Sequence, residues 1–350
     1  MHLLSEKAQQ LTPYVAGLQP QERGWIKLNT NENPYPTSEK VTEALAAVNL
    51  ADLRLYPDGD STLLRAAISN VLNVPRENIF CGNSSDEVLA LAFQAFFSGK
   101  ARVLSPDISY GFYPVWAQMY DVGMEFVPVG EDFTVDADAY HGGNGVVIAN
   151  PNAPTSLAIS LEDVEKIMAA NENSVVIIDE AYIDFARVQS AVSLVEKYEN
   201  LLVVRTFSKA HSLAGLRVGY AIGSEGLIDG LRRVRDAFNS YPLGLLAQTA
   251  AAAAISDVAH LKATTSDIVV TRDIAMGAIR LNNINVLESQ ANFIFMEVSD
   301  APALYEHLLD NKILVRHWNK PRLENFLRVS VGTKEDMNAF HECLVKYLNV

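Results

Sequence analysis

The chain has 350 residues, of which 49% are hydrophobic and 20% are charged, and its formal net charge at pH 7 is −14. This length and composition exclude a disordered chain and predict one large domain with a smaller one beside it. The negative charge argues against nonspecific binding to nucleic acid or to an anionic membrane, so local arginines would have to bind any anionic ligand.

Two further features bear on where the protein works. Cys81 and Cys343 are too few for a disulfide framework, and they fit a reducing compartment. No apolar run approaches the length of a membrane span, and the polar opening MHLLSEKAQQ lacks the apolar core of a secretory signal. We therefore expect a cytoplasmic protein with no membrane or nucleic-acid partner.

Three regions are expected along the chain. Residues 1–29 would form an amino-terminal arm, residues 30–259 a large domain, and residues 260–350 a small domain against which the arm packs. Early in the large domain, the short strand Ile79–Cys81 is followed by Ser84, Ser85 and Asp86, and a helix is predicted over Val88–Phe97. Small residues at a helix start leave backbone amides free, so this turn predicts an anion site.

Three apolar runs in the large domain end in polar residues and predict parallel strands, whose carboxyl ends bind ligands in open α/β sheets. They are Val146–Ala149 before Asn150–Thr155, Val175–Ile178 before Asp179, and Leu201–Val204 before Thr206, Ser208 and Lys209. Asp179 would need a cation as its partner after a buried strand. Desolvation would lower the pKa of Lys209 and free its amine to form a Schiff base, while Arg217, with the hydroxyls of Thr206 and Ser208, suits a phosphate.

The small domain alternates predicted strands and helices. The strands are 292–298, 313–316 and 326–331, and the helices are 302–310 and 335–348. Arg316 and Arg328 lie on two of these strands and would suit anions. Arg322 lies in the polar loop between them and is expected to be solvated, although it could substitute for Arg316.

Eight motifs, in one order along nearly the whole chain, resemble the fold-type I pyridoxal-phosphate-dependent aminotransferases, and within them most closely the histidinol-phosphate aminotransferase family. They are LNTNENPYP (28–36), LYPD (55–58), GNSSDE (82–87), SYGFYP (109–114), NPNAPT (150–155), DEAYIDF (179–185), TFSKAHSLAGLRVGY (206–220) and LRVSVGT (327–333). The resemblance implies an α/β fold with a mostly parallel central sheet, a homodimer and pyridoxal 5′-phosphate as the cofactor.

The resemblance also implies roles for individual residues around that cofactor. Lys209 would bind its aldehyde and move the proton, Asp179 would face the ring nitrogen, and Tyr182 would face the ring oxygen. The other implied cofactor contacts are Ser84, Ser85, Asp86, Asn150, Asn152, Thr206, Ser208, Arg217, Tyr110 stacked on the ring, and Tyr56 reaching into the neighbouring subunit's site.

The substrate contacts that the resemblance implies are Tyr14, Asn33, Tyr241, Arg316 and Arg328. For Tyr14, surface packing is an equal alternative. The implied reaction is transamination of L-histidinol phosphate with 2-oxoglutarate, which gives imidazole-acetol phosphate and glutamate in histidine biosynthesis. No metal site is expected.

The sequence departs from the family pattern at three positions. Ala153 stands where the family has an asparagine that hydrogen bonds the ring oxygen, so Asn150, Asn152 or Tyr182 alone would serve that oxygen. Ser84 and Ser156 stand where the family commonly has glycine.

Other functions on the same fold are aromatic amino acid transamination and threonine-phosphate decarboxylation. A nonenzymatic protein that binds pyridoxal phosphate or a nucleotide is a more remote alternative. The chain has no Walker A pattern, no GxGxxG after a strand and no appended basic region, which argues against nucleotide or DNA binding.

Overall fold

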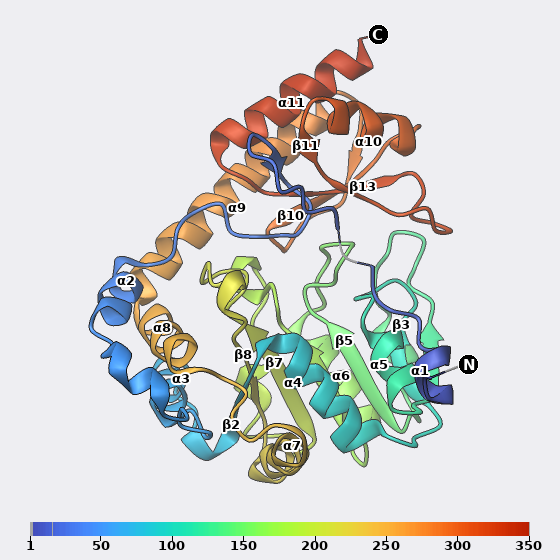
Figure 1. The fold of residues 1–350 in the computed structure, drawn as a ribbon. Helices are drawn as coiled ribbons and strands as arrows, with labels where there is room; N and C mark the ends of the chain where they lie inside the picture. The colour runs from blue at the N-terminus through green and yellow to red at the C-terminus, as the bar shows by residue number, and fades with distance from the viewer. Residues whose placement is uncertain (1–2, 16, 350) are drawn as a thin grey trace.

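The computed structural model describes residues 3–15 and 17–349. Its larger part is built on a seven-stranded sheet and its smaller part on a four-stranded sheet, and the long helix α9 (Val258–Arg280) runs from one part to the other (Figure 1). Within the described residues, no helix is long and apolar enough to cross a membrane.

The seven-stranded sheet has the order β2-β8-β7-β6-β5-β3-β4. Its strands are β2 (Ile79–Gly82), β3 (Val103–Pro106), β4 (Met124–Val127), β5 (Gly145–Ala149), β6 (Val176–Asp179), β7 (Leu201–Thr206) and β8 (Gly219–Ile222). The neighbours from β4 to β7 all pair in parallel, whereas β8 is antiparallel to both β7 and β2. The predicted α/β class with a mostly parallel sheet is therefore confirmed.

Helices cover both faces of this sheet. The helices are α2 (Glu39–Ala46), α3 (Thr62–Leu72), α4 (Ser84–Ala92), α5 (Tyr113–Met119), α6 (Leu161–Ala170), α7 (Glu225–Phe238) and α8 (Leu245–Ser256). Because side chains alternate along a strand, Leu201 and Val203 of β7 pack with α3, α6 and α8, whereas Leu202 and Val204 pack with α4, α5 and α7. Covering both faces explains why β5, β6 and β7 are buried along their whole length.

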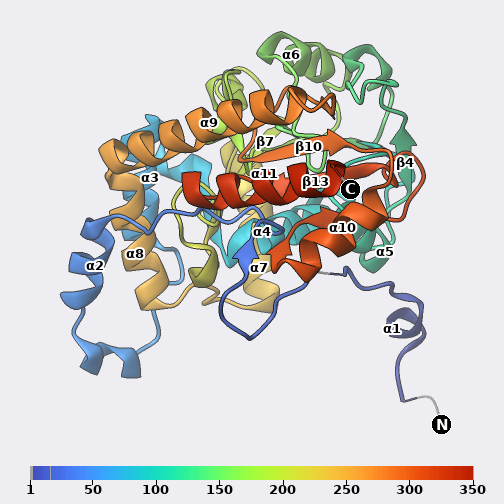
Figure 2. The ribbon, with the colours of Figure 1, turned by 90° about the horizontal axis from the view of Figure 1, so that it is seen from above.

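The smaller part carries an antiparallel sheet of order β12-β13-β10-β9. Its elements are β9 (Asn285–Val286), β10 (Phe293–Glu297), α10 (Ala301–Asp310), β12 (Arg316–His317), β13 (Phe326–Ser330) and α11 (Lys334–Leu348). Seen from above, α11 lies between α9 and α10, and the arm with α1 (Glu6–Gln10) extends to one side (Figure 2). Short helical turns connect the elements: η1 (Leu50–Arg54), η2 (Arg76–Asn78), η3 (Phe93–Phe97), η4 (Ala137–Ala139), η5 (Ile183–Phe185), η6 (Ala191–Leu194) and η7 (Ala214–Leu216).

Two predicted elements differ from the structure. The strand expected over 313–316 is divided at Val315, because β11 (Ile313–Leu314) pairs with β1 (Ile26–Lys27) of the arm while Arg316 turns to pair with β13. The helix expected over 88–97 begins at Ser84 as α4 and ends as the single π-helical turn η3. Both differences arise from strand pairing and helix packing with distant parts of the chain, which the local sequence pattern does not show.

Candidate active site

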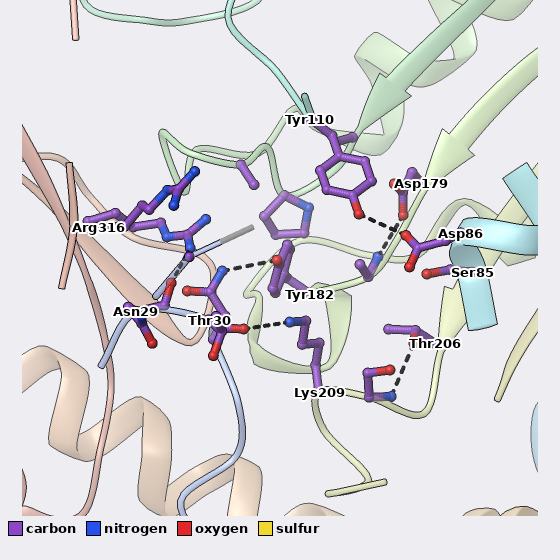
Figure 3. Close-up of a pocket in the computed structure, with 18 of the residues that line it drawn as sticks. Asn29, Thr30, Ser85, Asp86, Tyr110, Asp179, Tyr182, Thr206, Lys209 and Arg316 are labelled. Carbon is purple, nitrogen blue, oxygen red and sulfur yellow. Dashed lines mark hydrogen bonds between the residues drawn. The ribbon is translucent and has the colours of Figure 1, made fainter. Parts of the chain in front are cut away.

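A pocket lies between the two parts, where the carboxyl ends of β5, β6 and β7 face β12 and β13 (Figure 3). It contains twelve of the predicted site residues: Tyr14, Ser85, Asp86, Tyr110, Asp179, Tyr182, Thr206, Ser208, Lys209, Arg217, Arg316 and Arg328. Because β5, β6 and β7 are parallel neighbours, their polar carboxyl ends meet at one edge of the sheet, as the order of the motifs predicted.

Asp179 is the last residue of β6, and its side chain is buried at the floor of this pocket. The Tyr113 hydroxyl donates to Oδ2 at 2.9 Å, and the Ala181 amide donates to Oδ1 at 3.2 Å. Burial nevertheless raises the pKa of Asp179 to about 7, since these bonds offset only part of the desolvation of the carboxylate. A cation bound in the pocket would favour the ionised form of Asp179 again.

Lys209 follows β7 and reaches across the pocket to Thr30, the residue that directly follows the arm. Its Nζ donates a hydrogen bond to the Thr30 carbonyl oxygen at 2.9 Å and lies 5.7 Å from the centroid of the Tyr182 ring. Burial, together with the positive charge of Arg328, lowers the pKa of Lys209 to about 8. The unprotonated amine, which a nucleophile requires, is therefore much more abundant near neutral pH than for an ordinary lysine, at about a tenth of the population.

The start of α4 and the residues after β7 form a cradle for an anion. Ser85, Thr206, Ser208 and Arg217 line it, and Arg217 donates to Ser208 Oγ at 3.4 Å and to Asp86 Oδ2 at 2.7 Å. Gly219 of β8 permits the close approach, because a Cβ there would lie 2.2 Å from the Ser85 backbone nitrogen. Free amides at the start of α4 add partial positive charge to the donors.

Tyr110 lies on the opposite wall of the pocket from the amine of Lys209 (Figure 3). Its hydroxyl donates to Asp86 Oδ1 at 2.7 Å, and its ring packs edge-on against Tyr113 with centroids 5.6 Å apart. Asp86 therefore holds both Tyr110 and Arg217, which fixes an aromatic wall beside the anion cradle.

Arg316 and Arg328 face the pocket from the smaller part. They lie directly opposite each other on β12 and β13, and both guanidinium groups lie over the Trp318 ring, at 5.4 Å and 5.3 Å from its centroid. Within residues 3–15 and 17–349, neither guanidinium has a carboxylate within 4.0 Å, and the Nε of Arg328 is buried without a hydrogen-bond partner. Like charges placed opposite each other repel, so this arrangement favours an anionic ligand between them.

Three consecutive residues where the arm meets the large domain, Asn29–Asn31, contact three of these side chains, and no sequence pattern singled them out. The carbonyl of Asn29 accepts from Arg328 at 2.7 Å, and that of Thr30 accepts from Lys209. The Asn31 side chain donates to the Tyr182 hydroxyl at 3.0 Å. The motif LNTNENPYP (28–36) covers this segment, but two of these contacts use backbone carbonyls, which side-chain types do not report.

Six predicted residues do not line the pocket. Asn150 and Asn152 donate their amides to the carbonyls of Ile159 and Ile108, so Pro151 and Ala153 line the pocket in their place. The remaining four lie elsewhere: Asn33 donates to the Ala210 carbonyl, Ser84 starts α4, and the exposed Tyr56 and Tyr241 stack on each other with centroids 4.8 Å apart.

Both serines that stand where the resembling family has glycine adopt left-handed backbone. The φ angle of Ser84 is +76° and that of Ser156 is +65°, and both residues are buried. An L-residue with a Cβ is strained there, which gives a physical reason for glycine at these positions. The Ser156 hydroxyl is also buried without a hydrogen-bond partner.

Two supporting residues were missed at the sequence level. Tyr113 was included in the SYGFYP motif without a role, although it hydrogen bonds Asp179; a tyrosine one helical turn after Tyr110 was the available signal. Trp318 lies in a polar loop of the sequence, and only the pairing of β12 with β13 shows why it contacts two arginines.

The pocket fits a phosphorylated aromatic aldehyde. Arg217 and its neighbouring hydroxyls offer donors for the phosphate, Asp179 offers an anion for a protonated ring nitrogen, and Lys209 offers an amine for the aldehyde. The described residues contain no group of three or more His, Cys, Asp or Glu side chains that could hold a metal ion.

Comparison with known proteins gives a consistent result. The family model described as "Aminotransferase class I and II" matches residues 23–344. A histidinol-phosphate aminotransferase of Brachyspira hyodysenteriae is 44% identical over 99% of this chain and 98% of its own length, and histidinol-phosphate aminotransferase 2 of Psychrobacter arcticus is 45% identical over 99% and 94%. The crystal structure of histidinol-phosphate aminotransferase from Sinorhizobium meliloti, in complex with pyridoxal-5′-phosphate, superposes with a TM-score of 0.90 at 22% identity, covering 100% of this chain and 98% of its own.

Proposed function

Because the chain belongs to the aminotransferase class I and II family, we propose that it transfers the amino group of L-histidinol phosphate to 2-oxoglutarate, with pyridoxal 5′-phosphate as its cofactor. The products would be imidazole-acetol phosphate and glutamate, in a step of histidine biosynthesis. One pocket carries this proposal, because it places Lys209, Asp179 and Arg217 opposite Arg316 and Arg328. Among the described residues, these last two arginines have no carboxylate within 4.0 Å.

The cofactor side of the pocket is defined as Asp179, Tyr182, Thr206, Lys209 and Arg217. Thr206 and Arg217 would hold the phosphate of the cofactor, and each of the other three has a separate task. When bound, pyridoxal phosphate supplies an aldehyde that accepts the amino group and a ring that withdraws electrons from the breaking C–H bond. Lys209 would remove the proton at the substrate α-carbon as a general base and return it to the adjacent cofactor carbon as a general acid. Asp179 would keep a proton at the ring nitrogen, and Tyr182 would donate to the ring oxygen.

The substrate side of the pocket is defined as Asn29–Asn31, Arg316 and Arg328, and its two arginines would bind the anionic groups. L-Histidinol phosphate carries a phosphate, and 2-oxoglutarate carries two carboxylates. Both substrates therefore need cationic side chains in addition to Arg217, which would bind the phosphate of the cofactor. The paired register of Arg316 and Arg328 supports this role, since an anion between them would relieve their mutual repulsion.

We also propose a homodimer in which Tyr56 enters the partner's site. Large exposed apolar side chains concentrate in two stretches of chain, residues 50–63 and 238–246, which the stacked rings of Tyr56 and Tyr241 bring side by side. They are Leu50, Leu53, Leu55, Tyr56, Leu63, Phe238, Tyr241 and Leu246. A contiguous apolar surface of this kind favours association. The free thiols of Cys81 and Cys343 support a cytoplasmic location.

The proposal is tested by the absorption spectrum of the purified protein with pyridoxal phosphate, followed by addition of single amino donors. L-Histidinol phosphate should convert the Lys209-linked chromophore to the amine form of the cofactor, and 2-oxoglutarate should restore it. A panel with aromatic amino acids and threonine phosphate, with detection of released carbon dioxide, separates the two other functions on this fold. Faster conversion by an aromatic amino acid, or gas release from threonine phosphate, would contradict the proposed substrate.

A further inference from the structure

We propose that Asn31 is a positioning residue that directs the hydroxyl proton of Tyr182 into the pocket, toward the ring oxygen of the cofactor. This inference rests on the proposed function. It adds Asn31, two residues after the arm, to the reaction and assigns it control over how readily Lys209 is protonated once it is linked to the cofactor.

The hydrogen-bond pattern around Asn31 fixes the direction of its amide. The Ser330 hydroxyl accepts the Asn31 backbone N–H at 2.8 Å, which leaves its own proton to donate to Asn31 Oδ1 at 3.0 Å. With Oδ1 occupied, Nδ2 faces Tyr182 and donates to the hydroxyl oxygen at 3.0 Å. The Asn292 side chain donates to the Asn31 carbonyl at 3.0 Å and completes the network.

Burial and backbone conformation hold this network in place. Asn31, Ser330 and Asn292 are at most 2% exposed, so an unmade bond among them would be costly. Asn31 adopts left-handed backbone with a φ of +56°, a conformation that asparagine tolerates better than most residues. The side chain therefore reaches Tyr182 from one fixed direction.

The consequence concerns the proton of Tyr182. Its hydroxyl accepts from Asn31, so its single proton is free to be donated, and no protein acceptor for it is present among the described residues. Tyr182 lines the pocket, as does Ala153, which carries no polar side-chain atom and can neither compete nor assist. Because Asn150 and Asn152 are bonded elsewhere, Tyr182 alone among these residues can donate to the ring oxygen.

A hydrogen bond donated to the ring oxygen spreads its negative charge and weakens its attraction for a proton on the neighbouring nitrogen. In the cofactor-loaded enzyme that nitrogen is the Nζ of Lys209. Asn31 should therefore lower the pKa at which the Lys209-linked chromophore changes colour, and this pKa is read by absorption without any turnover.

The experiment titrates that chromophore in the loaded wild type, Asn31→Asp and Asn31→Gly. Asn31→Asp keeps the size and the bond from Ser330, but a carboxylate accepts the Tyr182 proton and turns it away from the pocket. Asn31→Gly tolerates the left-handed backbone and removes both side-chain bonds. We expect the chromophore pKa to rise by about 1 or more in Asn31→Asp, the size of one hydrogen bond to a charged group, and by less in Asn31→Gly.

If Asn31 had only a structural role, the chromophore pKa would change more in Asn31→Gly than in Asn31→Asp, because Asn31→Gly loses more hydrogen bonds. Asn283 provides the matched control, since it is exposed, has a φ of +58° and does not line the pocket; Asn283→Asp and Asn283→Gly should leave the chromophore pKa unchanged. Ser330→Ala, which frees the Asn31 amide, should give a rise between those of wild type and Asn31→Asp.

A double-mutant cycle separates the hydrogen bond from the added negative charge. In a Tyr182→Phe background, Asn31→Asp should raise the chromophore pKa much less than it does in the wild type. A rise of equal size in both backgrounds, or a larger effect of Asn31→Gly than of Asn31→Asp, would overturn the inference. A wild type that forms no chromophore would instead overturn the proposed function, and this inference with it.

Discussion

The cofactor side of the pocket differs from the substrate side in how far along the chain its residues come from. Asp179, Thr206 and Lys209 each lie at or just after a strand of one parallel sheet, so short motifs bring them together. The substrate side joins segments that are 299 residues apart, as in the bonds from Asn31 to Ser330 and from Arg328 to Asn29. The residues proposed for the chemistry thus lie along one edge of the sheet. The residues proposed for substrate binding lie where Asn29–Asn31 meet the smaller part.

The largest expected effect tests the cofactor side at its amine. Lys209→Ala should abolish multiple turnover, because no other group in the pocket can both bind the aldehyde and carry the proton. The measurement is steady-state transamination of L-histidinol phosphate. Lys197→Ala, which removes an exposed lysine paired with Glu165, should retain full activity. Turnover by Lys209→Ala without an added amine would break the assignment.

The next largest effect tests Asp179, the carboxylate at the end of β6, which is the neighbour of β7. Asp179→Asn should lower kcat by roughly a hundredfold or more, since an amide cannot hold the ring nitrogen in its charged form. Protein yield and the folded spectrum should stay close to wild type, because the asparagine fills the same space. An unchanged kcat would show that Asp179 does not serve the ring.

The same substitution has a pH signature in the cofactor-free protein. Burial raises the folded-state pKa of Asp179 from 3.8 to about 7, so its neutral form stabilises the fold below that range. The contribution of protonated Asp179 to the free energy of unfolding is complete below pH 3.8 and is lost as the pH rises to about 7. The melting temperature of Asp179→Asn should therefore increase relative to wild type across this interval and then level off. A difference that is independent of pH would contradict the shifted pKa.

A smaller and more selective effect is expected on the substrate side. Arg316→Ala should lower kcat/KM for L-histidinol phosphate roughly tenfold to a hundredfold, the value of one charge-assisted contact, and should affect a neutral aromatic amino acid much less. Arg322→Ala is the control, because Arg322 donates to the carbonyls of Val129 and Gly130 outside the pocket. Equal losses for both donors would remove the anion-reading role from Arg316.

The smallest expected effect is a change in the free energy of unfolding when Ser156 is replaced. Ser156→Gly should stabilise the protein by about 1 kcal/mol, because it removes a strained left-handed Cβ and a buried hydroxyl without a partner. Ser212→Gly is the matched change at a φ of +58°, where the residue is only half-buried, and should gain less. Chemical denaturation measures both, and a loss of stability in Ser156→Gly would show that its hydroxyl is bonded.

The same contrast explains what could be predicted from sequence. The α/β class and the group around Asp179 and Lys209 followed from apolar runs that end in polar residues, because neighbouring parallel strands bring such ends together. The family followed from the resemblance of eight motifs and their order along the chain. The contacts of Asn29 and Thr30 could not be predicted, since they use backbone carbonyls. Trp318 was missed because the register of β12 against β13 brings two arginines over its ring, and register depends on the whole sheet.

The central claim is that Lys209 carries the cofactor at the end of β7. Borohydride reduction of the loaded enzyme, followed by proteolysis and mass spectrometry, measures this directly. The account predicts a single pyridoxyl phosphate modification on the peptide that contains Lys209, and its loss in Lys209→Ala. A modification on a different lysine of the wild type, or none at all, would contradict it.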